Sequence, residues 1–410
     1  MFRRPALADG RSVPTRNAAV YVCLARASRD FSDGFVAVLL PVYLTAMGFG
    51  AFEIGIVATL ALFGSALTTL AFGALGAKTD QRKLLLVASG LMVASGLAFA
   101  IASTFAVILL ISFMGTINPS SGSSGIFGSL EQAVLSRSVA DSRRTKIFAR
   151  YSLVGALAAA VGALASGSPD LLARLGVSQL AALQAMFLLY ALLGLVGGAL
   201  YACIPTQAAR TVEEPVAVLG PSRRIVIKMA ALFSIDSLAS GFAVQSLVVL
   251  WLFNKFDLSL SAAGLIFFWT GVLSAFSFPV AAWLSVRIGL VNTMVFTHIP
   301  SSIFLILAAI VPNLETALAC LMLRAALSQM DVPTRASYVM AVVTPPERPA
   351  AASITTVSKS LAAATSPALG GALFAAGYES WPLIICGVLK ILYDLALLWT
   401  FRHIKPPEEQ

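Results

Sequence analysis

The chain alternates long apolar runs with short polar connections along its whole length. A helix needs about 20 apolar residues to cross a bilayer, and most of these runs reach that length. The strands of a membrane barrel would show short alternating patterns instead. The twelve runs cover residues 18–47, 51–76, 84–104, 105–136, 146–167, 177–203, 226–253, 260–285, 291–312, 315–343, 351–377 and 381–401. This pattern predicts an all-α membrane protein with twelve transmembrane helices.

The fourth run contains a stretch that an ordinary membrane helix would not tolerate. Residues 115–132 read GTINPSSGSSGIFGSLEQ, so Asn118, Pro119 and a series of glycines and serines precede Glu131. Irregular backbone survives at membrane depth only against protein or a water-filled cavity. A carboxylate there costs about 2.5–3.5 kcal/mol. The tenth run has a counterpart at residues 329–335, QMDVPTR. We therefore expect the protein to use these two segments for its function.

Composition supports a membrane protein, and the distribution of charge predicts its orientation. Hydrophobic residues make up 58% of the chain and charged residues 11%, whereas a soluble domain averages about 25% charged residues. The net charge of +9 comes mainly from short connections on one side of the membrane, so no nucleic-acid partner is expected. Basic short loops stay in the cytoplasm. We therefore expect a multi-pass protein of the bacterial cytoplasmic (inner) membrane with both termini in the cytoplasm.

Cysteine and histidine usage argues against an enzyme. The chain has two histidines, His298 and His403, and it has neither an HExxH motif nor a nucleophile elbow. No CxxC pair occurs, so neither a zinc site nor a disulfide framework is expected, and no cofactor is implied. His298 is expected to be a packing residue, with a proton relay as the alternative. Small apolar packing is expected of the scattered cysteines, with soft metal or metalloid binding as the alternative: Cys23, Cys203, Cys320 and Cys386.

The two halves of the chain look like repeats. Val139 and Gly167 recur as Val343 and Gly371, each 204 residues later, and the longest internal polar stretch separates six runs from six. Transporters show this kind of internal symmetry. The expected domains are a cytoplasmic tail at 1–17, a six-helix bundle at 18–203, a cytoplasmic linker at 204–225, a second six-helix bundle at 226–402 and a tail at 403–410.

Twelve runs, the six-plus-six division and the long central linker resemble the major facilitator superfamily. Its best-known mark is a loop between the second and third spans with the pattern G-x-L-a-D-R-x-G-R-K. The loop here departs from it, because Ala77 stands at the family's aspartate and Asp80 stands where a glycine is usual. A second copy in the other half also lacks the aspartate. The resemblance implies that these loops latch the inner gate, through Gly73, Asp80, Arg82, Lys83, Arg287 and Gly289.

A second family mark is the glycine–proline motif that antiporters carry in the fifth span. The fifth span here has Gly155, Gly162 and Gly167 without the proline, and the better match is SPALGG at residues 366–371 in the eleventh run. The resemblance therefore favours antiport and efflux. The fourth-span arginine of drug/proton antiporters has no clear equivalent, and Glu131 lies near that region instead.

Polar side chains inside the apolar runs are the candidates for a substrate and proton pathway, because a buried carboxylate is able to load and release a proton. Asp331 and Arg335 are four residues apart on one helix and therefore able to pair. The repeat also places Arg335 opposite Glu131, which predicts a salt bridge between the halves. The candidates are Asp33, Asn118, Glu131, Asp236, Asp331 and Arg335.

Two further charged pairs have a simpler interpretation. Arg29 and Asp30 either extend to the inner membrane interface, as long charged side chains do, or belong to the site. Lys390 and Asp394 are four residues apart in the last run and are expected to neutralise each other locally.

The sequence therefore predicts a secondary active transporter that acts as a monomer in the lipid bilayer. We expect it to export a small molecule against an inward flow of protons, with the two bundles moving around a central cavity lined by the first, fourth, seventh and tenth spans. Export of an inorganic ion or metalloid, as in arsenical resistance, is the first alternative. A sensor or scaffold with a transporter fold is the second.

Overall fold

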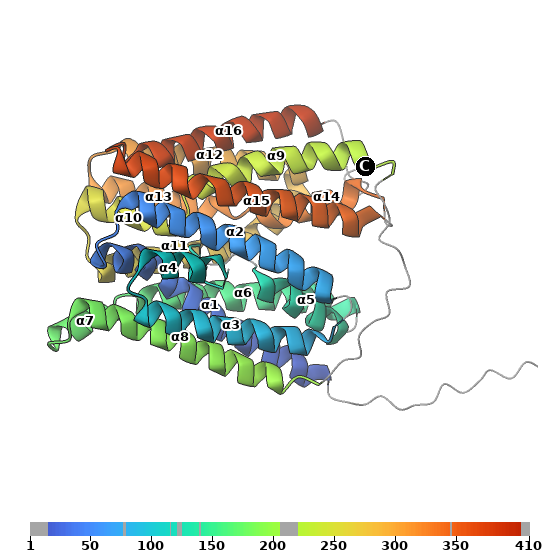
Figure 1. Ribbon diagram of the computed structural model, residues 1–410. Helices are drawn as coiled ribbons and strands as arrows, with labels where there is room; N and C mark the ends of the chain where they lie inside the picture. Colours follow the sequence, from blue (N-terminus) through green and yellow to red (C-terminus); the bar gives the residue numbers. More distant parts are fainter. Residues whose placement is uncertain are drawn as a thin grey trace, which may run out of the picture.

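The computed structural model describes residues 15–76, 79–114, 116–120, 125–138, 141–205, 220–344 and 347–402. Most of the expected tails and linker, at 1–14, 206–219 and 403–410, lies outside the described residues. Every regular element of the described part is a helix, which confirms the predicted fold class (Figure 1). Eight helical spans of the described part are long and apolar enough to cross a membrane, judged by length and composition; one of them joins α6 to α7 and another joins α9 to α10.

Helices α1–α8 form the N-terminal half. Two of them begin at residues whose side chains cap the first turn, as polar N-cap residues do: the Asp80 carboxylate accepts a hydrogen bond from the backbone amide of Arg82, and the Ser178 hydroxyl accepts one from Ala181. The helices are α1 (Thr15–Ala46), α2 (Ala51–Gly76), α3 (Gln81–Ile101), α4 (Phe105–Phe113), α5 (Ile126–Ser138), α6 (Asp141–Ala165), α7 (Ser168–Arg174) and α8 (Gln179–Ala202).

Helices α9–α16 form the C-terminal half. Gly289 separates α11 from α12 with φ of 87°, a backbone conformation that favours glycine. The helices are α9 (Arg223–Phe242), α10 (Gln245–Phe256), α11 (Leu260–Ile288), α12 (Leu290–Ile310), α13 (Leu314–Ser328), α14 (Asp331–Val342), α15 (Arg348–Ala375) and α16 (Trp381–Phe401).

Three of the predicted spans are broken helices. The fourth span divides into α4 and α5 and the tenth into α13 and α14, and both divisions fall at the segments that stand out in the sequence. The seventh span also divides, into α9 and α10, at Ala243 and Val244. At this third break the backbone amide of Ser246 donates to the carbonyl of Pro119, 3.2 Å away. The interruptions of the fourth and seventh spans therefore meet each other across the two halves.

The helices have two common ends. We call the end with residues 47–50, 175–178, 257–259 and 376–380 the far end. The opposite end, with residues 79–80, 203–205, 220–222 and 343–344, is the linker end because the linker leaves from it and returns to it.

The two halves hold together toward the far end. There the Asp170 carboxylate accepts hydrogen bonds from the backbone amide and the hydroxyl of Ser261, at 2.9 and 2.7 Å. Helix α2 also lies beside α15 (Figure 1). A Cβ on Gly55 would meet the Pro367 carbonyl oxygen at 2.6 Å, so only glycine allows this approach. One apolar core runs through both halves, whereas a second is confined to the C-terminal half and reaches its linker end, with Val226, Met229, Leu397 and Phe401 among its members.

Candidate functional site

Each half contains a cluster of charged side chains that are largely withdrawn from solvent. The N-half cluster consists of Arg26, Arg29, Asp30, Asp33 and Glu131, with Tyr151 and Tyr201. The C-half cluster consists of Asp236, His298, Asp331, Arg335, Lys390 and Asp394. Burying charges is costly unless each one is paired and hydrogen-bonded, so the partners of each group decide what the clusters are able to do.

The N-half cluster is centred on Arg29 of α1. Its Nη2 atom lies 3.0 Å from Asp30 Oδ1 and 3.3 Å from Glu131 Oε2. Arg26, one turn earlier, pairs with the other oxygen of Asp30. Two arginines and one aspartate of the same helix thus form a continuous ion-pair network that extends to α5. The expectation that Arg29 and Asp30 merely reach the membrane interface is wrong, because both are buried inside the bundle.

Glu131 of α5 is fully buried, with none of its surface exposed. Besides its ion pair with Arg29, it accepts hydrogen bonds from the hydroxyls of Tyr151 on α6 and Tyr201 on α8. The Tyr151 hydroxyl in turn accepts a hydrogen bond from Arg26, at 2.9 Å. Four helices are therefore joined at this one carboxylate, and its hydrogen bonds offset the cost of burying it.

Asp33 differs from the other carboxylates of the N-half cluster. It lies one turn beyond Arg29 and Asp30 on α1, and 6% of its surface is exposed. Its buried Oδ1 atom has no hydrogen-bond partner among the described residues. The cluster holds two arginines and three carboxylates, and the arginines are paired with Asp30 and Glu131. Asp33 is thus the carboxylate for which no cation of its own is provided.

The C-half cluster is centred on Asp236 of α9. One of its oxygens accepts from Arg335 of α14 at 2.9 Å, and the other accepts from Lys390 of α16 at 2.7 Å. Arg335 also binds Asp331, four residues earlier on its helix, which confirms the predicted local pair. The predicted pairing of Lys390 with Asp394 is wrong, because Lys390 is directed to Asp236 and Asp394 binds a histidine.

That histidine is His298 of α12, which belongs to the cluster and is not a mere packing residue. Its Nδ1 lies 3.0 and 3.1 Å from the two carboxylate oxygens of Asp394, and its Nε2 lies 3.4 Å from Lys390 Nζ. A lysine has only protons to donate, so this geometry assigns the ring proton to Nδ1, which donates to Asp394, and lets Nε2 accept from Lys390. The histidine thereby links Asp394 to the network around Asp236.

The two clusters use equivalent positions with opposite charges. In the N-terminal half the first span provides the cation, Arg29, and the fourth span provides the carboxylate, Glu131. In the C-terminal half the seventh span provides the carboxylate, Asp236, and the tenth span provides the cation, Arg335. Each half therefore closes its own ion pair between its first and fourth spans. The predicted salt bridge between Glu131 and Arg335 is replaced by these two pairs.

The remaining predicted site residues lie apart from the clusters. The Asn118 side chain accepts a hydrogen bond from the backbone amide of Ser120 at 3.0 Å, which supports the loop between α4 and α5. Asp80, Arg82 and Lys83 surround the start of α3, where Asp80 is the N-cap. Gly73 has open space around its Cα, and the guanidinium carbon of Arg287 lies 3.9 Å from the centre of the Trp283 ring. The predicted role of these loops in gating stays a prediction.

Several residues of the clusters were not identified from the sequence. Arg26 was readable in principle, because it stands four residues before Asp30 on one helix. Tyr151 and Tyr201 carry no such local signal, since their partner Glu131 comes from another span. Within the described residues, no group of three or more His, Cys, Asp or Glu side chains is placed to hold a metal ion.

Comparison with known proteins agrees with this architecture. The chain is 26% identical to the uncharacterized membrane protein YJR124C of Saccharomyces cerevisiae over 92% of both proteins. Its fold is similar to that of a bacterial homologue of the human lysosomal transporter Spinster in an inward-facing, unoccupied conformation, with a TM-score of 0.71, 13% identity and coverage of 95% and 99% of the two chains. The nucleoside transporter NupG is similar as well, with a TM-score of 0.72, 12% identity and coverage of 94% and 99%.

The family assignment rests on both halves of the chain. A profile of the Major Facilitator Superfamily matches residues 22–242 and matches again over residues 229–410. The two matches together extend over nearly the entire sequence and include both charged clusters. The chain therefore belongs to the Major Facilitator Superfamily, and it is a multi-pass membrane transporter and not an enzyme.

Proposed function

We propose that this transporter exports a small solute in exchange for protons, with Asp33 as the proton-binding group. The observation that carries the proposal is the buried Asp33 carboxylate whose Oδ1 lacks a hydrogen-bond partner among the described residues. An uncompensated charge at this depth is costly. Binding one proton removes that charge without breaking an ion pair, whereas protonating Asp30 or Glu131 would separate it from Arg29.

The position of Asp33 suits a coupling site. It lies on α1, one turn from Arg29, and α1 packs against α5, α6 and α8 of its own half and against α10 and α11 of the other. A change of charge on α1 therefore acts both on the N-half cluster and on the contact between the halves. Alternating access requires the far-end contacts to open, including the one between Asp170 and Ser261.

The direction of transport is proposed from the eleventh span. Residues 366–371 resemble the antiporter motif, and they lie on α15 where it approaches α2 closely at Gly55. The Thr59 hydroxyl on α2 also accepts a hydrogen bond from the backbone amide of Ala368, at 2.9 Å. The motif thus lies at the contact that has to change when the halves move, as an exchange mechanism requires.

Proton-coupled export is tested by growth and then by transport. A transporter-deficient host expressing the chain is screened for resistance to organic drugs and to metalloids. A compound that passes the screen is then added to energised everted vesicles, and a pH-sensitive dye reports proton movement. We expect the compound to dissipate the pH gradient, and an ionophore that collapses the gradient to abolish uptake into these vesicles. Uphill uptake that survives the ionophore would exclude proton coupling.

We also propose that the linker end faces the cytoplasm, because the basic connections lie there. Cys203 provides a native probe in a Cys23→Ala background, since Cys203 is exposed at this end, Cys23 is partly exposed, and Cys320 and Cys386 are buried. A membrane-impermeant maleimide should label Cys203 only after the cells are permeabilised, and Cys203→Ala should remove that signal. Labelling of Cys203 in intact cells, at the level seen after permeabilisation, would reverse the orientation.

A further inference from the structure

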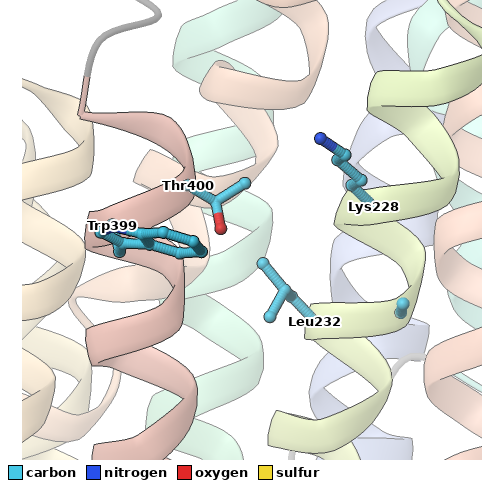
Figure 2. Close-up of a pocket in the computed structure, with 5 residues that line it drawn as sticks. Lys228, Leu232, Trp399 and Thr400 are labelled. Carbon is cyan, nitrogen blue, oxygen red and sulfur yellow. The ribbon is translucent and has the colours of Figure 1, made fainter.

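A groove opens on the surface of the C-terminal half between α9 and α16, near the linker end. Its volume is about 500 Å³, and it is lined by Lys228, Ala231, Leu232, Trp399 and Thr400. Figure 2 shows Leu232 and Thr400 between the two helices, with the Lys228 amine directed into the same space. Helix α16 packs against α9, α12 and α15 of its own half, so the groove lies away from the N-terminal half.

The floor of the groove is closed. Beneath it, Val226 and Met229 of α9 and Leu397 and Phe401 of α16 are buried in the apolar core of the C-terminal half. A ligand in the groove therefore stays on the surface of the bundle and does not reach the C-half cluster. Because this surface belongs to membrane-spanning helices, the molecules available to fill the groove are those of the bilayer.

The linker end of the groove suits an anionic group. Lys228 is exposed and lies five residues after the start of α9, about 7.5 Å along the helix. Arg223 and Arg224 in the first turn of α9 are exposed about one turn nearer the linker end, and Arg402, the residue after α16, is exposed at that end as well. Basic pockets between membrane helices bind anionic lipid headgroups. The surrounding charge is therefore complementary to a phosphate group.

The remaining surface suits an acyl chain. Trp399 is 78% exposed at the last turn of α16, where tryptophan anchors a protein at the level of the headgroups. Exposed Leu395 and Leu392 continue this face of α16 toward the far end, and Ile235 does the same on α9. The groove thus changes from basic to apolar along its length, in the order in which a phospholipid changes from headgroup to chain.

We propose that the groove between α9 and α16 binds one anionic phospholipid. Its phosphate lies against Lys228, and an acyl chain follows the apolar face of Leu392, Leu395 and Trp399. The site does not depend on which solute the protein transports, and its test uses no transport measurement.

The test is native mass spectrometry of the full chain with phosphatidylglycerol and phosphatidylcholine of identical acyl chains. We expect one phosphatidylglycerol to bind more tightly than phosphatidylcholine. A basic residue near the surface contributes about 1 kcal/mol to anionic lipid binding, so Lys228→Ala should weaken the binding of phosphatidylglycerol about fivefold. It should weaken the binding of phosphatidylcholine less, because the choline cation offsets the charge of its phosphate. Trp399→Ala should weaken the binding of both lipids, because it removes an apolar contact that their acyl chains share.

Arg348→Ala is the matched control, since Arg348 is an exposed cation at the linker end of the same half but on α15. It should not alter lipid binding. Lys228 and Trp399 are exposed, so their variants are expected to fold, which thermal melting verifies. Equal binding of the two lipids, or an equal loss in Arg348→Ala, would overturn the proposal. A lipid-free dimer that Trp399→Ala dissociates would assign the groove to a contact between two copies of the chain and would also overturn it.

Discussion

Asp33→Asn is expected to abolish uphill transport while leaving the fold intact. Asparagine has the same shape as aspartate but neither binds nor releases a proton in the physiological range. A proton gradient of 100 mV provides about 2.3 kcal/mol per charge, which sustains about a fiftyfold ratio of substrate concentrations. We expect this ratio to fall to unity in proteoliposomes containing the variant, whereas exchange of labelled for unlabelled substrate continues.

Stability separates a coupling role of Asp33 from a structural one. Its buried Oδ1 has no hydrogen-bond partner among the described residues, so losing the charge should leave the melting temperature unchanged or raise it. The neighbouring change Asp30→Asn should instead destabilise the protein, because Asp30 pairs with both Arg26 and Arg29. Ser32→Ala is the matched neutral control on the same buried turn. If the Asp33→Asn variant sustains the full ratio of substrate concentrations, a group other than Asp33 binds the coupled proton.

Glu131→Gln and Arg335→Gln are each expected to destabilise the protein. The loss should be about 3–5 kcal/mol for Arg335→Gln, which leaves a buried charge without a partner, and smaller for Glu131→Gln, because Arg29 keeps its ion pair with Asp30. Glu131→Gln removes one of the two carboxylates that bind Arg29, and Arg335→Gln leaves Asp331 unpaired. The two residues have no partner in common among the contacts described above, so the losses should add in the double variant. Unfolding in a denaturing detergent, followed by tryptophan fluorescence, measures these free energies.

A double-mutant cycle on Arg29 and Glu131, which lie in the same half, is the comparison for this pair of variants. Arg29→Gln combined with Glu131→Gln should cost less than the sum of the single changes, because both members of one ion pair are removed together. Two results together would contradict the pairing seen in the structure. The first is a double variant Glu131→Gln with Arg335→Gln that loses less stability than the sum of its single changes. The second is a double variant Arg29→Gln with Glu131→Gln whose loss of stability equals that sum. They would instead favour the salt bridge between the halves.

Much of the architecture follows from local sequence. The apolar runs predict the spans, because the bilayer imposes their length. The interruptions at 114–125 and 329–330 are also readable, since asparagine, proline, glycine and charges are costly in a membrane helix. The pair of Asp331 and Arg335 follows from a spacing of four residues. The break at Ala243 and Val244 had a weaker signal, because Gly241 stands two residues before it but no proline or charge adjoins it.

Only the tertiary structure decided which charges meet. The repeat correctly places Glu131 and Arg335 at equivalent positions of the fourth and tenth spans, but equivalent positions in two related bundles need not be neighbours. Each residue faces the interior of its own bundle, where it meets the first helix of that bundle: Arg29 for Glu131 and Asp236 for Arg335. Sequence by itself determined the spans, the segments at which the fourth and tenth spans break and the local pair, because bilayer thickness and helix periodicity act over short distances. The partners of the other buried charges depend on the packing of helices that are far apart in the chain.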